Sequence, residues 1–279
     1  MSDHTIDGLV GQLQRFDPFE SKYVIPRRVE IWTPPEYTEN AQQRFAVLYM
    51  HDGENLFDPS SSQYSHTDWG IDETITRLTG GQKIRPTIVV GMWSTEKRIL
   101  EYMPQRLPQG PALDRLNGML KKHTNHAICS DDYLRFIVEE MKPFVDAHYR
   151  TLPDQPNTFI MGSSMGGLIS LYAMCEYPQV IGGAGCVSTH FPIGRGITLQ
   201  YMQGNLPDPR THKFYFDYGT RTIDKAYEKY QLRADKMLSA EGYIQGNNWI
   251  TRKFEGHEHS EKDWRKRVHV PLEFLLRKD

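Results

Sequence analysis

The predicted fold is decided by NTFIMGSSMGG, residues 157–167. A short apolar run that predicts a strand precedes Gly162, and an apolar helix is expected over residues 167–176. Between them Ser164 is the central residue of a GxSxG pattern, which is typical of a sharp strand-to-helix turn that exposes a serine hydroxyl. Gly162 and Gly166 suit this turn because they carry no Cβ to keep the strand and the helix apart. We therefore expect Ser164 to be a nucleophile at a helix N-terminus, where backbone N–H groups stabilise negative charge.

Outside this stretch, runs of apolar and β-branched residues alternate with segments of helical spacing. Strands are predicted over residues 29–33, 46–50, 87–92, 158–161, 184–188, 213–218 and 249–254. Helices are predicted over residues 131–149, 167–176, 225–240 and 261–276. This alternation predicts an α/β fold with a mainly parallel central sheet and helices on both faces. Residues 22–33 instead predict antiparallel edge strands, because Pro26 cannot donate to a central ladder.

The length and composition fit one elaborated domain. The chain has 279 residues, of which 38% are hydrophobic and 24% charged, so it can bury a large core. No linker separates two compositions, and we expect residues 1–279 to form a single domain. Residues 95–125 break the strand–helix rhythm with several prolines in polar sequence. We expect this segment to be an insertion over the active-site edge of the sheet.

The charge pattern excludes several classes of partner. The formal net charge is −2 and the basic residues are scattered, so neither nucleic acid nor an anionic membrane surface is an expected partner. No stretch approaches the roughly 20 apolar residues of a membrane span, and the N-terminal sequence does not resemble a signal peptide. The three cysteines lack metal-ligand spacing. These features predict a cytoplasmic protein with reduced cysteines, and they leave its oligomeric state undetermined.

A serine nucleophile of this kind needs a base and an acid, which follow it in the order Ser, acid, His. Two histidines, His257 and His259, follow the last predicted strand, and each is a candidate for the base. A metal site is not expected there, since no further cluster of ligands completes one. Asp224 follows the preceding strand and suits the acid that orients the imidazole, although it could also cap the next helix. Asp217 is the alternative acid.

Longer stretches carry a resemblance to a known family. These are VLYMHDGENLFD (47–58), DWGIDE (68–73), IMGSSMGGLISLYA (160–173), FYFDYGT (214–220) and GHEHSEKDW (256–264). In them the sequence resembles the esterase D group of the α/β-hydrolase superfamily, which includes family 1 carbohydrate esterases, enterochelin-type esterases and S-formylglutathione hydrolases. The resemblance covers most of the chain and implies an α/β-hydrolase fold.

The resemblance also implies roles for particular residues. It makes Ser164 the nucleophile, Asp224 the acid and His259 the base, because the family's catalytic histidine precedes the polar residues and tryptophan that open the last helix. It further implies an oxyanion hole formed by the backbone N–H groups of Glu54 and Met165.

Two more residues are candidates for substrate binding. Trp69 and His190 are expected in loops at the carboxyl ends of strands, where ligands bind in open α/β sheets. Together the candidates predict hydrolysis of a small-molecule carboxylic ester, such as an acylated carbohydrate, through an acyl-enzyme and without a cofactor. The alternatives are an acyltransferase of the same fold, in which an alcohol replaces water, and a non-catalytic ligand-binding homologue.

Overall fold

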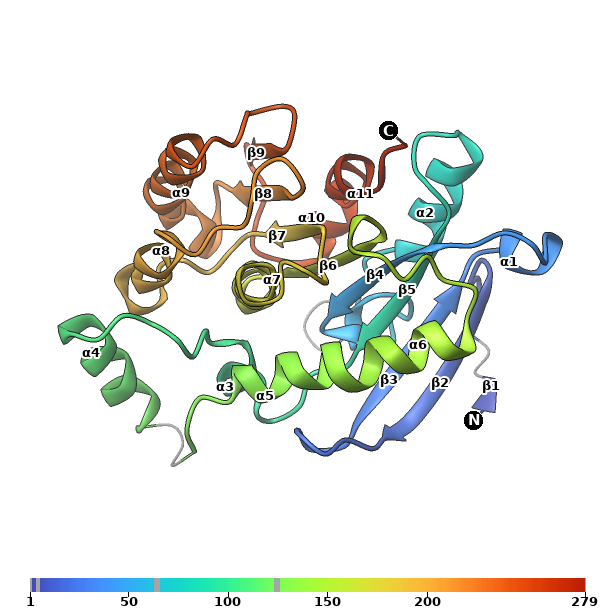
Figure 1. The fold of residues 1–279 in the computed structure, drawn as a ribbon, viewed down its shortest axis with the longest axis horizontal. Coiled ribbons are helices and arrows are strands. Elements are labelled where there is room, and N and C mark those ends of the chain that lie inside the picture. The colour runs from blue at the N-terminus through green and yellow to red at the C-terminus, as the bar shows by residue number, and fades with distance from the viewer. Residues whose placement is uncertain (1, 4–5, 63–65, 123–125, 279) are drawn as a thin grey trace.

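The computed structural model describes residues 2–3, 6–62, 66–122 and 126–278, and a mixed sheet lies at its centre (Figure 1). The nine described strands stand in the order β1-β2-β3-β5-β4-β6-β7-β8-β9. Their bounds are β1 (Ser2–Asp3), β2 (Gln12–Phe19), β3 (Arg27–Thr33), β4 (Ala46–His51), β5 (Thr87–Met92), β6 (Thr158–Ser163), β7 (Gly183–Val187), β8 (Lys213–Gly219) and β9 (Trp249–Phe254).

The larger part of the sheet is parallel. The pairs from β5 through β4, β6, β7 and β8 to β9 are all parallel. Strand β3 is antiparallel to both of its neighbours, β5 and β2. Every residue of β4, β5 and β6 is buried, as expected for strands covered on both faces. The mainly parallel α/β fold predicted from the sequence is therefore confirmed. The carboxyl ends of the parallel strands meet at one edge of the sheet, the usual place for a ligand site.

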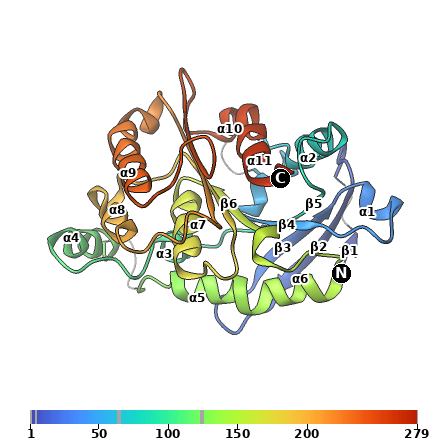
Figure 2. The same cartoon turned by 45° about the horizontal axis from the view of Figure 1, so that its top comes forward.

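Helices cover both faces of this sheet (Figures 1 and 2). Side chains of β4 alternate between the two cores: Val47 and Tyr49 join one apolar cluster, and Leu48 and Met50 join the other. One face carries α2 (Ile71–Gly80), α10 (Glu261–Arg267) and α11 (His269–Leu276). The other carries α5 (Ser130–Arg135), the π-helix η2 (Phe136–Met141), α6 (Lys142–His148), α7 (Met165–Glu176), α8 (Ile197–Met202) and α9 (Glu228–Ala240).

The described part of the chain holds several further helices. They are α1 (Glu36–Glu39), α3 (Arg98–Tyr102), α4 (Pro111–Leu120) and the 3-10 turns η1 (Gly53–Asn55), η3 (Gln155–Asn157), η4 (Ile193–Arg195) and η5 (Thr222–Ala226). Both α3 and α4 belong to the segment 95–125, of which residues 123–125 lie outside the described part of the chain. A buried ion pair ties this segment to the sheet, since Arg27 of β3 donates to Glu101 at 2.6 Å and 3.0 Å.

Several elements differ from the sequence prediction, and two of them are informative. Residues 22–26 form no strand, and the antiparallel neighbour of β3 is instead Gln12–Phe19, which the sequence analysis missed. This strand lies near the sheet margin and is only partly buried, so its residues show no clear apolar alternation. The predicted helix over 261–276 is broken at Val268, because Pro271 has no N–H to continue the helical hydrogen bonding.

Candidate active site

Ser164 occupies the strained turn between β6 and α7. Its backbone angles are φ 58° and ψ −117°, a conformation that a residue with a Cβ rarely adopts. The turn is held by the neighbouring strand end, because Ser164 N donates to Val187 O at 2.9 Å and His190 N donates to Ser164 O at 3.1 Å. Such strain is typical of a functional site, where the surrounding structure fixes a reactive side chain.

The glycines around this serine are required by close packing. A Cβ on Gly162 would lie 2.9 Å from Cδ2 of the buried His51 and 3.0 Å from the backbone of Gly166. Real Cβ atoms almost never approach other heavy atoms that closely. The Tyr133 hydroxyl lies 2.8 Å from Nδ1 of His51 and holds this ring in place against the turn.

His259 and Asp224 come together beside this turn. The Nδ1 atom of His259 lies 2.6 Å from Oδ1 of Asp224, which is fully buried, whereas the His259 side chain keeps 13% of its surface exposed. Asp224 lies in η5 directly after β8, and His259 lies in the loop between β9 and α10. A backbone bond from His259 N to Thr222 Oγ1 at 3.0 Å joins the two loops. His259 and Ser164 line the same pocket.

The Asp224 carboxylate is held in its charged form by its surroundings. Burial raises its pKa, but hydrogen bonds and charge from His259, with further hydrogen bonds from Ser188 and Gly219, give a net lowering. Ser188 Oγ and Gly219 N both donate to Oδ2, each at 2.7 Å. The carboxylate therefore remains an acceptor that can orient the His259 ring.

The other two candidates, Asp217 and His257, have different partners. Asp217 is bound by Arg267 Nη2 at 3.0 Å and by the Tyr215 hydroxyl at 2.8 Å. The His257 ring lies 3.4 Å from Arg267 Nη1, and its carbonyl oxygen accepts bonds from Thr220 N and Arg221 N at 3.0 Å each. His257 thus fixes the loop through its backbone, while its ring is turned toward Arg267.

Each of the two candidate oxyanion residues lines a pocket together with Ser164. Met165 opens α7, so its N–H has no partner within the helix. Glu54 lies in η1, after Asp52 in a left-handed conformation, and its buried side chain accepts a bond from Ser94 N at 2.9 Å. Burial, and to a smaller extent Asp52, raise the pKa of Glu54. The Glu54 side chain therefore anchors its loop to Ser94.

Two pockets meet at Ser164. The first, about 410 Å³, is lined mainly by polar and charged residues, among them Asp52, Asn55, Ser94 and His259. The second, about 540 Å³, has a mostly apolar lining that includes Ile99 and Met119. Ser163, which precedes Ser164, is buried yet also lines the polar pocket.

The two predicted substrate-binding residues have different positions. His190 lines the apolar pocket together with Ser164. Trp69, in contrast, is 3% exposed, packs against Trp264 with ring centroids 5.5 Å apart, and is not among the described residues lining either pocket. The structure therefore makes Trp69 part of the core beneath the site rather than a substrate contact. Its place after a strand end did not distinguish a buried from an exposed ring.

Tyr227 is a site residue that the sequence analysis missed. Its hydroxyl is hydrogen-bonded to His190 Nδ1, and its ring meets that of His259 edge-on, with centroids 5.8 Å apart. Burial and Asp224 raise the pKa of Tyr227, while a hydrogen bond with Ser164 opposes the rise. Burial and His259 lower the pKa of His190 to about 4, so the pair is neutral at pH 7. Tyr227 lies three residues after Asp224, which is one turn of a 3-10 helix, and this spacing is the sequence signal that could have identified it.

A charged pair flanks the polar pocket. Arg98 of α3 binds both oxygens of Asp52, at 2.6 Å and 2.8 Å, and lines both pockets. Across the described part of the chain, no group of three His, Cys, Asp or Glu side chains is placed to hold a metal ion. Nor does any helix there have the length and apolar character needed to cross a membrane.

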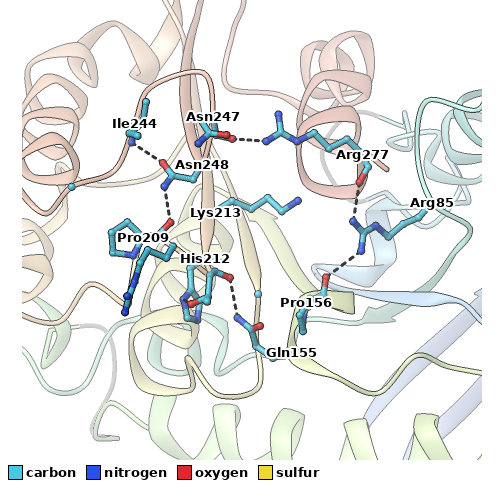
Figure 3. Close-up of a pocket in the computed structure, with 14 residues that line it drawn as sticks. Arg85, Gln155, Pro156, Pro209, His212, Lys213, Ile244, Asn247, Asn248 and Arg277 are labelled. Carbon is cyan, nitrogen blue, oxygen red and sulfur yellow. Dashed lines mark hydrogen bonds between the residues drawn. The ribbon is translucent and has the colours of Figure 1, made fainter. Parts of the chain in front are cut away.

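A separate pocket of about 520 Å³ lies at the opposite edge of the sheet (Figure 3). Arg85 and Arg277 line it, and Arg85 donates to the carbonyl oxygens of Arg277 and Pro156 at 2.9 Å and 3.3 Å. Lys213, at the amino end of β8, lies in the same pocket. Since Ser164 follows the carboxyl end of β6, this pocket is distinct from the candidate active site.

The mainly parallel sheet and the strained serine turn define an α/β-hydrolase fold. A model of the family described as "Putative esterase" matches residues 25–269, and the chain belongs to this family. It is 25% identical over 162 residues to the uncharacterized protein YbbA of Bacillus subtilis (strain 168), across 58% of this chain and 56% of that protein. It is also 24% identical over 186 residues to an endo-1,4-beta-xylanase/feruloyl esterase of Xylanibacter ruminicola, across 63% of this chain and 19% of that protein. Each match therefore spans less than two thirds of the relative.

Solved structures share the fold over nearly the whole chain. A ferulic acid esterase superposes with a TM-score of 0.69 and 15% identity, covering 96% of this chain and 98% of that one. The BES protein from Bacillus cereus gives 0.70 and 13%, covering all of both chains. The enterobactin esterase FES from Shigella flexneri gives 0.67 and 18%, covering 96% of this chain and 61% of that one. At these identities the likeness concerns the fold alone.

Proposed function

We propose that this protein is a serine-dependent carboxylic ester hydrolase with Ser164, His259 and Asp224 as its catalytic triad. The observation that carries the proposal is the placement of a strained serine and a carboxylate-bound histidine in one pocket, with Nδ1 of His259 2.6 Å from Asp224. Membership of the esterase family supports the same activity. An imidazole held by a buried carboxylate is the arrangement that activates a serine hydroxyl.

In the proposed mechanism Ser164 Oγ attacks the ester carbonyl while His259 Nε2 takes its proton. The oxygen that becomes negative is stabilised by the N–H groups of Glu54 and Met165, and each such donor typically contributes about 10²-fold to 10³-fold in rate. His259 then returns the proton to the departing alcohol, which leaves Ser164 acylated. A water molecule, deprotonated by His259, attacks the acyl group; the bond to Ser164 Oγ breaks, and His259 returns the proton to Ser164 as the acid leaves.

The two pockets suggest which part of the ester lies on each side. We propose that the apolar pocket binds the acyl group, because its wall includes the exposed apolar side chains of Ile99 and Met119. The polar pocket, with Asp52, Asn55 and Arg98, suits a hydroxyl-bearing alcohol such as a sugar. On this proposal the segment 95–125 is an insertion in a single domain, and it supplies the wall of the acyl pocket. His190 is a further acyl-side contact.

Hydrolysis of a panel of esters tests this function. Esters that vary in acyl length and in alcohol polarity are incubated with the wild-type chain and with Ser164→Ala. We expect turnover by the wild-type chain, with a preference for an apolar acyl group on a polar alcohol, and none by the variant. Added alcohols would show acyl transfer as a new ester product. Equal activity of both proteins would contradict the proposal, and binding without any product would favour a non-catalytic binding protein.

A further inference from the structure

A fully buried serine lies directly behind the Asp224 carboxylate. Ser188 follows β7, has φ 41°, and exposes none of its surface. Its hydroxyl oxygen lies 2.7 Å from Asp224 Oδ2, 2.8 Å from Arg267 Nη2 and 3.1 Å from Trp264 Nε1. Its backbone N–H donates to Asp217 at 3.0 Å. Ser188 thus contacts the acid, the strand beside it and the last helical region of the chain.

The direction of the Ser188 proton follows from its partners. A guanidinium and an indole N–H can only donate, so Arg267 and Trp264 occupy the two acceptor positions of the hydroxyl oxygen. The single hydroxyl proton is then left for Asp224 Oδ2, which can only accept while it is ionised. Asp224 therefore receives one bond from Ser188 and one from Gly219 on Oδ2, with Oδ1 directed at His259.

The same contacts connect the acid to the element that follows the base. Arg267 and Trp264 belong to α10, which begins after the loop that carries His259. Arg267 is 1% exposed, binds both oxygens of Asp217 and lies 4.0 Å from Asp224 Oδ2. A shift of α10 would therefore be transmitted to Asp224 through the Ser188 hydroxyl.

We propose that Ser188 is a positioning residue of the triad, whose hydroxyl fixes the Asp224 carboxylate in the orientation that holds His259. This inference rests on the proposed function, because it assigns Ser188 a role in the same reaction. It identifies what Ser188 does for catalysis beyond filling space: the hydroxyl sets the rotation of the carboxylate, and so the direction of the His259 ring. The strained backbone at Ser188 is the cost of bringing the hydroxyl to that point.

Two substitutions separate the hydroxyl from the backbone. Both Ser188→Ala and Ser188→Gly remove the hydroxyl, but only glycine relieves the positive φ. If the hydroxyl matters, kcat should fall about tenfold to a hundredfold in both, because misplacing a catalytic group by about 1 Å can cost 10²-fold, while KM stays the same. Ser130→Ala is the matched control, since Ser130 is equally buried and belongs to a different element, α5.

The pH profile provides a readout that a purely structural role would not move. His259 and Arg267 face the Asp224 carboxylate, and Tyr227 and His190 interact with His259. Loss of the Ser188 bond raises the pKa of Asp224, so the Asp224–His259 pair takes up a proton more readily. The acidic limb of the kcat/KM profile should move to higher pH in both variants and stay in place in Ser130→Ala.

Labelling with a serine-directed phosphonate keeps the two proposals distinguishable. If the wild-type chain is not labelled at Ser164, the proposed function fails. If it is labelled and both Ser188 variants keep wild-type kcat and acidic limb, the positioning role alone is overturned. Full activity in Ser188→Gly, or loss of cooperative melting in both variants, would likewise overturn it, because Ser188 would then act through the backbone or the core. Slower labelling of both folded variants, with the shifted limb, is the expected result.

Discussion

At the scale of single residues, the two histidines of one short loop have different surroundings. His259 is directed at Asp224 and shares a pocket with Ser164, whereas the His257 ring lies against Arg267. A base in this position must reach both the acid and the nucleophile. Of these two histidines, only His259 is hydrogen-bonded to Asp224 in the described structure. The geometry therefore favours His259, the choice that the family resemblance implied.

Replacing each histidine tests this assignment. We expect His259→Ala to lower kcat by about 10⁴-fold or more, because members of a triad act as a unit and losing one removes most of the rate enhancement. His257→Ala should keep activity within about tenfold, since the backbone carbonyl that holds the loop remains in place. Steady-state kinetics on one ester checks both. A dead His257→Ala beside an active His259→Ala would reverse the assignment.

At the scale of elements, α3 and α4 present apolar side chains in a pocket that Ser164 also lines. Ile99 is 51% exposed and Met119 is 41% exposed, and both line the apolar pocket. An exposed apolar side chain by itself needs no explanation, but two of them on one pocket wall next to Ser164 indicate a binding surface. This is the physical basis for assigning the acyl group to that side.

Truncating this wall should change acyl preference. We expect Met119→Ala to lower kcat/KM for an octanoyl ester by several-fold to about tenfold, the low end for a contact in a hydrophobic pocket because Met119 is partly exposed. The value for an acetyl ester should stay the same, since a short acyl group does not reach the wall. Ile244→Ala is the control, as Ile244 is 61% exposed and lines the pocket at the opposite sheet edge. Equal losses on the two esters would argue against the assigned acyl side.

Elements with a local sequence signal could be predicted, and those that depend on distant contacts could not. The β6–α7 turn follows from Gly162, Ser164 and Gly166 within one short stretch. The contact between Ser188 and Arg267 joins residues 79 positions apart. Serine and arginine are both common residues, so no local sequence pattern predicts that these two meet. Trp69 failed for a related reason, because its burial against Trp264 is set by how α10 packs.

At the scale of the whole molecule, one buried and one partly buried histidine couple stability to pH. Burial lowers the pKa of His51 to about 3 and, together with His259, that of His190 to about 4, from an ordinary value of 6.5. In the unfolded chain both rings regain the ordinary value and take up protons as the pH falls through 6.5. The folded chain binds these protons only near pH 4 and pH 3, so acidification favours unfolding.

We therefore expect the free energy of unfolding to fall between pH 6.5 and pH 4. Each ring contributes up to about 1.4 kcal/mol per pH unit within its window. Denaturant unfolding at several pH values measures the slope. Carboxyl groups also contribute to this slope, so His51→Gln is compared with the wild-type chain. The free energy of unfolding of the variant should change less steeply with pH, because one fewer proton is taken up on unfolding. Identical slopes in the two proteins would show that His51 is not buried in its neutral form.

Whether Ser164 Oγ is the nucleophile is tested most directly by mass spectrometry of the protein treated with a serine-directed phosphonate. The intact wild-type chain should gain one phosphonyl group, the modified peptide should carry it on Ser164, and the same treatment should abolish the burst of product from a p-nitrophenyl ester. Ser164→Ala should not react and should lose about 10⁶-fold in turnover, as triad enzymes do without their nucleophile. Ser163→Ala should still be labelled at Ser164. A label on Ser163, or a Ser164→Ala variant that keeps a tenth of wild-type turnover, would contradict the account.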